Sequence, residues 1–217
     1  MSQPRTFTKK ALLSLGAVGV AASMAGLGTF ATFNDSTSAS QAVASGTVDI
    51  NLGTAGSADN RLTIGASGLV PGDTVQRRAK VTNAGSENLA SVVLTTVDTT
   101  TDPDTVLTTD ATNGLQMKIE RCTGTVGWTE SATTPYTYTC DATIAGDNAG
   151  VRSAVLASRA VIGADLALSG MQSVTAGSTD DMVVTLSLPT TADNTFQGKS
   201  ATIEYTFAGT QRNGASK

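Results

Sequence analysis

The sequence contains no histidine among its 217 residues. Histidine is the commonest general base, and it belongs to the Ser–His–Asp triads and to the HExxH zinc helix. A Ser–Lys or carboxylate-only mechanism is still available to such a chain, but no motif for either is present. We therefore predict a protein that has no catalytic residues, no cofactor and no metal ligands.

Aromatic and charged residues are also scarce, at 4% and 15% of the chain. Abundant glycine, threonine and valine favour strands over a helix bundle. Arg5, Lys9 and Lys10 precede every acidic residue, and the chain from Ala11 onward has 11 basic and 18 acidic side chains, a net charge of −7. Such a domain repels phosphate backbones, so we expect no nucleic-acid partner.

The first 31 residues have the composition of an export signal. A basic segment, 1–10, precedes an uncharged run, 11–33, whose apolar part is interrupted by glycines. Small residues predict cleavage between Ala31 and Thr32, and a second candidate site ends at Ala25. An uncleaved anchor is the alternative, because 23 uncharged residues can span a bilayer. In both cases we expect the domain that follows the signal to lie outside the cytoplasm. In the cleaved case the protein contacts the membrane only through the signal, before cleavage.

Beyond the signal, apolar residues recur with the period of two that is typical of strands. Segment 89–97 is apolar on both faces, which predicts a central strand. Arg77 falls on the inward side of its strand, as an exception to the pattern, and residues 149–168 fit either a short helix or a strand. The expected strands lie near 47–52, 62–64, 74–82, 89–97, 115–122, 136–140, 182–188 and 201–208.

Strands of this length and spacing predict an all-β fold, a two-sheet antiparallel β-sandwich of the jelly-roll type. We expect at most one or two short helices, and a cleaved signal helix before the domain. The expected organisation is a signal peptide, 1–31, an N-terminal segment, 32–46, a β-sandwich domain, 47–211, and a polar tail, 212–217.

The two cysteines, Cys122 and Cys140, lie on consecutive predicted strands of an exported protein. That setting predicts a structural disulfide rather than a redox pair. Closing a loop of roughly twenty residues would stabilise the fold by about 3 kcal/mol.

The connection 98–114 is rich in threonine and aspartate. Carboxylate oxygens are the ligands that calcium prefers, but the spacing fits no known calcium loop. We therefore expect a solvated acidic loop, and a calcium site is the alternative. The candidate ligands are Asp98, Asp102, Asp104 and Asp110.

Four segments resemble one known family in the same order along the chain. They are the signal, the junction GTFATFND at 28–35 with ASGTVDINL at 44–52, the block LVPGDTVQRRAKVTNAGSENLASVVL at 69–94, and the block NTFQGKSATIEYTFAGTQRNG at 194–214. Together they are similar to the SipW-dependent secreted biofilm-matrix proteins, which include TasA and camelysin (CalY). The middle of the chain, 98–170, does not match this family well, and the cysteine pair is not a feature of TasA.

The resemblance implies a sandwich secreted to the cell surface or biofilm matrix. It also implies that the freed N-terminal segment adds as a strand to the next copy, so that fibres grow head to tail. A sheet edge has unpaired backbone groups that a donated strand can satisfy, and a contact that does not close propagates. The donor would run from Thr32 to about Ser40, with Phe33 as its anchor, although its Ser/Thr-rich composition fits a disordered tail equally well. Its first residues are Thr32, Phe33, Asn34, Asp35 and Ser36.

We therefore expect a secreted, non-catalytic structural protein whose partner is itself, together with other matrix components. A monomeric cell-surface adhesin or binding module of the same fold is the alternative. Camelysin has also been assigned as a metallopeptidase, but a zinc site here would need carboxylates and cysteines alone, because the chain has no histidine.

Overall fold

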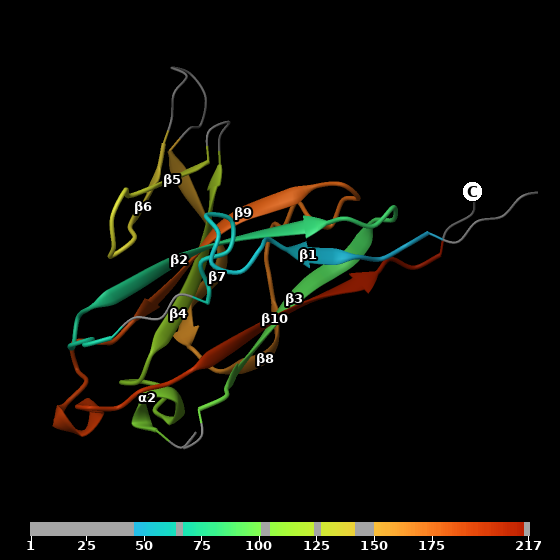
Figure 1. Cartoon of the computed structure of the whole chain (residues 1–217). Helices are drawn as coiled ribbons and strands as arrows, with labels where there is room; N and C mark the ends of the chain where they lie inside the picture. The colour runs from blue at the N-terminus through green and yellow to red at the C-terminus, as the bar shows by residue number, and fades with distance from the viewer. Residues whose placement is uncertain (1–45, 64–66, 101–104, 124–126, 142–149, 215–217) are drawn as a thin grey trace, which may run out of the picture. The chain divides into compact units, whose positions relative to one another are not determined.

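The computed structural model describes residues 46–63, 67–100, 105–123, 127–141 and 150–214 (Figure 1). Ser45–Lys217 form one compact unit. The predicted signal, its cleavage site and the predicted donor segment lie outside the described residues. Within these ranges no helix has the length and apolar character needed to cross a membrane.

The described chain is built mainly of antiparallel strands in two sheets and one hairpin. Sheet A has the order β1 (Ile50–Leu52), β2 (Thr74–Asn83), β9 (Thr179–Ser187), β4 (Gln116–Thr123) and β7 (Val151–Ala160). Sheet B has the order β10 (Ile203–Gln211), β3 (Leu89–Asp98) and β8 (Gly163–Ala167). The hairpin pairs β5 (Trp128–Glu130) with β6 (Tyr138–Cys140), and the helical turns are α2 (Val106–Thr109) and the 3-10 helix η1 (Asn194–Phe196).

Consecutive long strands alternate between the sheets. The chain passes from β2 in sheet A to β3 in sheet B and back to β4, and from β7 through β8 and β9 to β10 in the same way. All pairings within the two sheets are antiparallel. This arrangement confirms the predicted two-sheet antiparallel sandwich, and β3 is the central strand of sheet B as expected.

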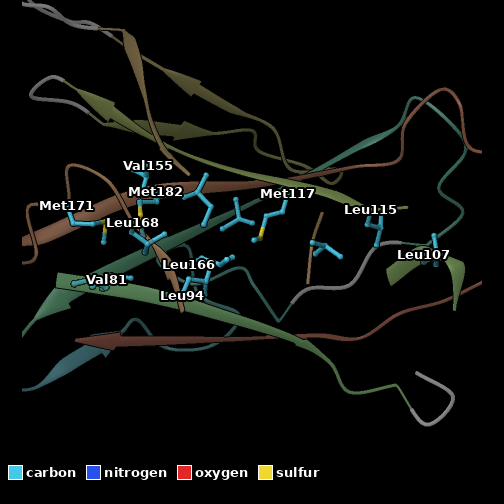
Figure 2. Close-up of a cluster of buried hydrophobic side chains, with 14 of the residues drawn as sticks. Val81, Leu94, Leu107, Leu115, Met117, Val155, Leu166, Leu168, Met171 and Met182 are labelled. Atoms are coloured by element: carbon cyan, nitrogen blue, oxygen red, sulfur yellow. The ribbon is translucent and has the colours of Figure 1, made fainter. Parts of the chain in front are cut away.

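The core lies between the two sheets (Figure 2). Met117 and Met182 of sheet A and Leu94 of sheet B are 0% exposed, and their side chains point toward one another. Each such side chain contributes about 1.5–3 kcal/mol when it is fully withdrawn from water. The period-two alternation of the sequence thus follows directly from strands with one buried face.

The ambiguous segment 149–168 forms the strands β7 and β8 over its described part, and no helix. The pairing of β4 with β7 shifts register on both sides of Ile119, as at a β-bulge. A bulge interrupts the alternation of inward and outward residues. For this reason the hydrophobic pattern alone did not separate strand from helix.

The short strand expected near 62–64 is not formed, although Ile64 itself lies outside the described residues. Asn60 makes a single bridge to Ala79, and its side-chain amide donates to the Gly53 carbonyl at 2.8 Å. Its Oδ1 accepts from the Leu62 backbone N–H at 3.2 Å, so the chain turns there. The asparagine side chain competes with the strand for these backbone groups.

Candidate assembly surface and the disulfide-linked hairpin

Cys122 and Cys140 form a disulfide, as predicted, with their Cα atoms 5.4 Å apart. Cys122 belongs to β4 of sheet A, and Cys140 ends β6 of the hairpin. The sequence prediction placed the cysteines on consecutive strands, whereas β5 lies between them. The bridge therefore ties the β5–β6 hairpin to sheet A.

The hairpin packs on the outer face of sheet A through a small second core. Trp128 and Tyr138 are 4% and 3% exposed and contact Val183, which faces away from the main core. The Trp128 indole N–H donates to the Asp181 carbonyl at 3.1 Å. The guanidinium of Arg152 lies over the Trp128 ring, 5.0 Å from its centroid, in a cation–π contact.

A charged cluster fixes the same hairpin to the segment that follows β1. Arg61 donates through Nε and Nη2 to the two carboxylate oxygens of Glu130, at 3.0 and 2.6 Å. The Tyr138 hydroxyl donates to Glu130 at 2.7 Å. The hydrogen bonds from Arg61 hold the pKa of the Glu130 carboxyl below its usual value, and burial raises the pKa of Tyr138 to about 12.

The described chain begins at one end of the sandwich, against the loop that follows β2. Thr47 exchanges hydrogen bonds with Ser86, and the Asp49 carbonyl accepts from the Ala84 N–H at 2.8 Å. Strand β1 then pairs with β2 in antiparallel fashion, with Ile50 opposite Asn83. Gly85 permits this approach, because a Cβ there would lie 2.3 Å from the Thr47 carbonyl oxygen.

The opposite end of β2 is less well covered. Ala79 and Val81 are 0% exposed, and β1 and the Asn60 bridge lie beside this half of the strand. The inward-facing Val75 and Arg77 remain partly exposed. Among the described residues, only those of β9 form backbone–backbone hydrogen bonds with residues 74–77. The Tyr138 N–H of the hairpin donates to the Gln76 side chain at 3.1 Å.

Strand β10 forms the edge of sheet B on the same side of the sandwich. The Thr202 carbonyl accepts from the Thr99 N–H, so Thr202 faces β3, and backbone alternation turns the N–H and C=O groups of residues 203, 205 and 207 away from β3. Among the described residues none bonds to that outer edge. The inward side chains of Ile203, Tyr205 and Phe207 are only partly buried, although all three pack against the core.

Strand β1 covers only the far part of β10. The Ile50 side chain fills the space beside Gly209, where an added Cβ would come within 2.5 Å of Ile50 Cδ1. Ile50 also pairs with Asn83, so the 83 end of β2 and the 209 end of β10 meet at β1. Residues 74–77 and 203–207 thus lie toward the other end, and we call these two stretches the open side.

Arg77 belongs to the open side and is on the inward face of β2, as the sequence pattern predicted. It pairs across the sheet with Val184, a core residue that is 1% exposed. Its Nη1 donates to the Gln76 carbonyl at 2.8 Å. Burial lowers the pKa of the Arg77 guanidinium, and the same guanidinium opposes the rise that burial causes in the pKa of Tyr205 on β10. The two side chains therefore influence each other across the gap between the sheets.

The acidic residues proposed for calcium are engaged in local hydrogen bonds where the structure describes them. The Asp98 carboxylate accepts from the Thr100 N–H and the Thr108 hydroxyl, at 2.9 and 2.8 Å. The Asp110 carboxylate accepts from the N–H groups of Thr112 and Asn113, both at 2.8 Å. Such bonds organise turns. The described residues contain no group of three or more acidic, cysteine or histidine side chains that could hold a metal ion, and the other two aspartates, Asp102 and Asp104, lie outside them.

The sequence predicted the disulfide but not the surface around it. Arg61 and Glu130 are separated by 69 residues, and neither belongs to a motif. The sequence placed Arg77 on the inward side of its strand as an exception to the pattern, but this did not predict the open side. The predicted cleavage residues Ala31 and Thr32, and the donor residues Phe33, Asn34, Asp35 and Ser36, lie outside the described residues.

Comparison with protein families gives one result. The family model described as camelysin metallo-endopeptidase matches residues 6–134, which is more than half of the chain. This range includes most of the predicted signal and the domain as far as β5. No curated protein matches the sequence.

Proposed function

The chain belongs to the camelysin family, and we propose that it is a secreted, non-catalytic structural protein that assembles into fibres by N-terminal donor-strand addition. In this proposal the signal is removed at Ala31/Thr32, and residues 32–40 of one copy pair with an edge strand of the next. The family membership and the sandwich fold are the foundation. The assembly step rests on the geometry of the open side.

The observation that carries the proposal is the incomplete cover of the open side. Sheet A has five strands and sheet B three, and β10 ends sheet B with its outer backbone groups directed away from β3. Inward apolar side chains at this edge, such as Tyr205 and Phe207, are partly exposed, whereas the central Leu94 is 0% exposed. An added strand would pair the edge and complete the burial.

The positions of the two ends favour pairing between copies. The described chain begins beside the loop 84–87, at the end of the sandwich where β1 lies. The open side lies toward the other end. A head-to-tail contact requires a donor segment at one end of the copy and an acceptor at the other. Such contacts add copy after copy into a filament when they do not close into a ring.

The length and composition of the donor suit the acceptor. Nine residues in extended conformation span about 30 Å, which matches a strand of the length of β10. Phe33 is the only aromatic side chain between Thr32 and Val48. Its complete burial between the sheets would contribute about 1.5–3 kcal/mol. Export fits the disulfide, because disulfides persist in oxidising compartments.

Metallopeptidase activity is implied by the family description, but the residues of this chain do not fit a zinc site. Both cysteines are held in the disulfide, and the sequence has no histidine. Protein zinc sites are built chiefly from cysteine thiolates and histidines, and a catalytic site needs three protein ligands. We derive no hydrolytic step. Casein hydrolysis that a chelator abolishes and added zinc restores would refute this part of the proposal.

Electron microscopy tests the assembly. We expect the chain that starts at Thr32 to form filaments and the chain that lacks residues 32–40 to remain monomeric. Thermal unfolding of both chains controls for folding, since the deleted residues precede the compact unit that begins at Ser45. Filaments that persist after the deletion would exclude the donor mechanism. A monomeric full chain would favour the alternative, a cell-surface adhesin or binding module.

A further inference from the structure

The sequence contains two Asn–Gly pairs, Asn113–Gly114 and Asn213–Gly214, and the structure places them in opposite surroundings. The backbone nitrogen of the residue that follows an asparagine can attack its side-chain amide, which closes a succinimide ring and releases ammonia. Asparagine is for this reason one of the thermolabile residue types. Glycine in the second position favours the attack, because it has no Cβ to hinder its nitrogen and leaves the backbone free to rotate.

The first pair is held in a tight turn. The Gly114 N–H donates to the Asp110 carbonyl at 3.0 Å, and Gly114 is buried. The Asn113 side chain donates to the Asp110 carboxylate at 3.2 Å and accepts from the Thr191 hydroxyl at 2.7 Å. Ring closure would require the Gly114 nitrogen and the Asn113 amide to leave these partners together. The fold therefore opposes the reaction at Asn113.

The second pair lacks these restraints. Asn213 and Gly214 are both exposed and follow the last strand, β10. Arg212 donates to the Asn213 carbonyl at 3.2 Å, but no described residue bonds to the Asn213 side chain or to the Gly214 nitrogen. An added Cβ at Gly214 would meet nothing within 4 Å, so the backbone has room to rotate there.

We propose that Asn213 is a site of spontaneous deamidation in the folded protein. The Gly214 nitrogen loses its proton and forms a bond to Cγ of Asn213, and the bond from Cγ to Nδ2 breaks with release of ammonia. Water then opens the succinimide at either of its carbonyl groups. The products are aspartate and isoaspartate at position 213, and the reaction consumes only water.

The modification adds a negative charge beside Arg212. The Arg212 guanidinium also pairs with Glu87 at 2.7 Å, on the loop whose Ser86 accepts from the Thr47 N–H. A carboxylate at position 213 competes with Glu87 for this guanidinium. Both partners of the existing pair are partly exposed, and ion pairs of this kind contribute little to stability. The deamidated chain therefore stays folded.

Peptide mapping by mass spectrometry, after incubation of the purified protein in mildly alkaline buffer, tests the proposal. We expect Asn213 to deamidate about tenfold faster than Asn113 or more, because the turn must open before Asn113 can react. In guanidinium chloride the two rates become similar, since each asparagine is followed by glycine. The protein that carries N213D is expected to keep the original thermal unfolding midpoint.

G214A is the matched variant for the mechanism. Its Cβ meets no neighbour in the fold but hinders the attacking nitrogen, so we expect deamidation at position 213 to slow about tenfold with unchanged thermal unfolding.

Each result decides one step of the inference. Equal rates at Asn113 and Asn213 in the folded protein would overturn the selection by the fold. An intact Asn213 under conditions where both asparagines react in guanidinium chloride would overturn the site itself. Deamidation of G214A at the original rate would overturn the succinimide route, and early unfolding of N213D would contradict a folded product.

Discussion

The guanidinium of Arg61 and the carboxylate of Glu130 meet through two hydrogen bonds, although 69 residues separate them in the chain. One partner follows the first strand of the sandwich, and the other ends β5 of the hairpin. The Tyr138 hydroxyl completes the cluster by donating to the same carboxylate. The hairpin is thus attached by this charged cluster to the segment after β1, and by the disulfide to sheet A.

Substitution of Glu130 tests the contribution of this cluster through its pH dependence. The pKa of Glu130 is lower in the folded chain than its ordinary value of 4.5, because Arg61 donates to its ionised form. Its contribution to stability is therefore present above pH 4.5 and is lost as the pH falls through the folded pKa. We expect E130Q to unfold more easily than the original chain near pH 7, with a difference that narrows in acid.

Urea unfolding at several pH values measures this difference. E204Q is the matched control, because Glu204 lies exposed on β10. A destabilisation of E130Q that stays constant from pH 7 to pH 3 would show that charge has no part in the attachment.

Removal of the disulfide tests the covalent attachment. We expect the variant with C122S and C140S to lose about 3 kcal/mol of unfolding free energy, because the bridge restricts the unfolded chain over a loop of 18 residues. Denaturant unfolding with and without reductant gives the value. Reductant should destabilise the original chain and leave the serine variant unchanged, and an equal response of both would contradict the prediction.

The sequence was sufficient to predict the sandwich, because a strand with one buried face shows alternating apolar and polar residues in the sequence. Along β10 the inward Tyr205 and Phe207 pack against the core, whereas the outward Glu204 and Thr206 are exposed. The pattern was insufficient where a side-chain hydrogen bond or a register shift interrupted the regular backbone pairing of strands. The Asn60 side chain accepts from the Leu62 N–H and turns the chain after a single bridge to β2. The register shifts around Ile119 interrupt the regular pairing of β4 with β7.

The surface features were harder to predict for a different reason. The contact between Arg61 and Glu130 depends on where the hairpin packs on sheet A. The local periodicity of the sequence does not predict that position. Arg77 was visible in the sequence as an exception to alternation, but the pattern alone did not explain it.

Asp180 provides a test of a buried carboxylate. It is 2% exposed and accepts from the backbone N–H groups of Gln172 and Ser173, at 3.0 and 2.7 Å. We expect D180A to cost about 1–3 kcal/mol of unfolding free energy, because both donors lose their acceptor in a buried site. D180N keeps one acceptor oxygen and should cost less. Equal stability of D180A and the original chain, measured by urea unfolding, would count against this account.

Gly85 tests how the start of the described chain is anchored. A Cβ at this position would lie 2.3 Å from the Thr47 carbonyl oxygen and 2.9 Å from the Asp49 nitrogen. These are backbone atoms, so the strand entry itself must move, and we expect G85A to lose about 1–3 kcal/mol. G214A is the control, because an added Cβ meets nothing within 4 Å there. Unchanged thermal unfolding of G85A would contradict the tight approach.

The unlike ends of the sandwich have a kinetic consequence. In the proposed fibre a copy without residues 32–40 keeps its acceptor, since β10 belongs to the compact unit that begins at Ser45. It can bind the donor strand of a neighbouring copy, but it has no donor strand of its own. Such a copy is a chain terminator, and a small fraction of shortened molecules would set the average fibre length. The position of one proteolytic cut near the N-terminus would then control how far the polymer grows.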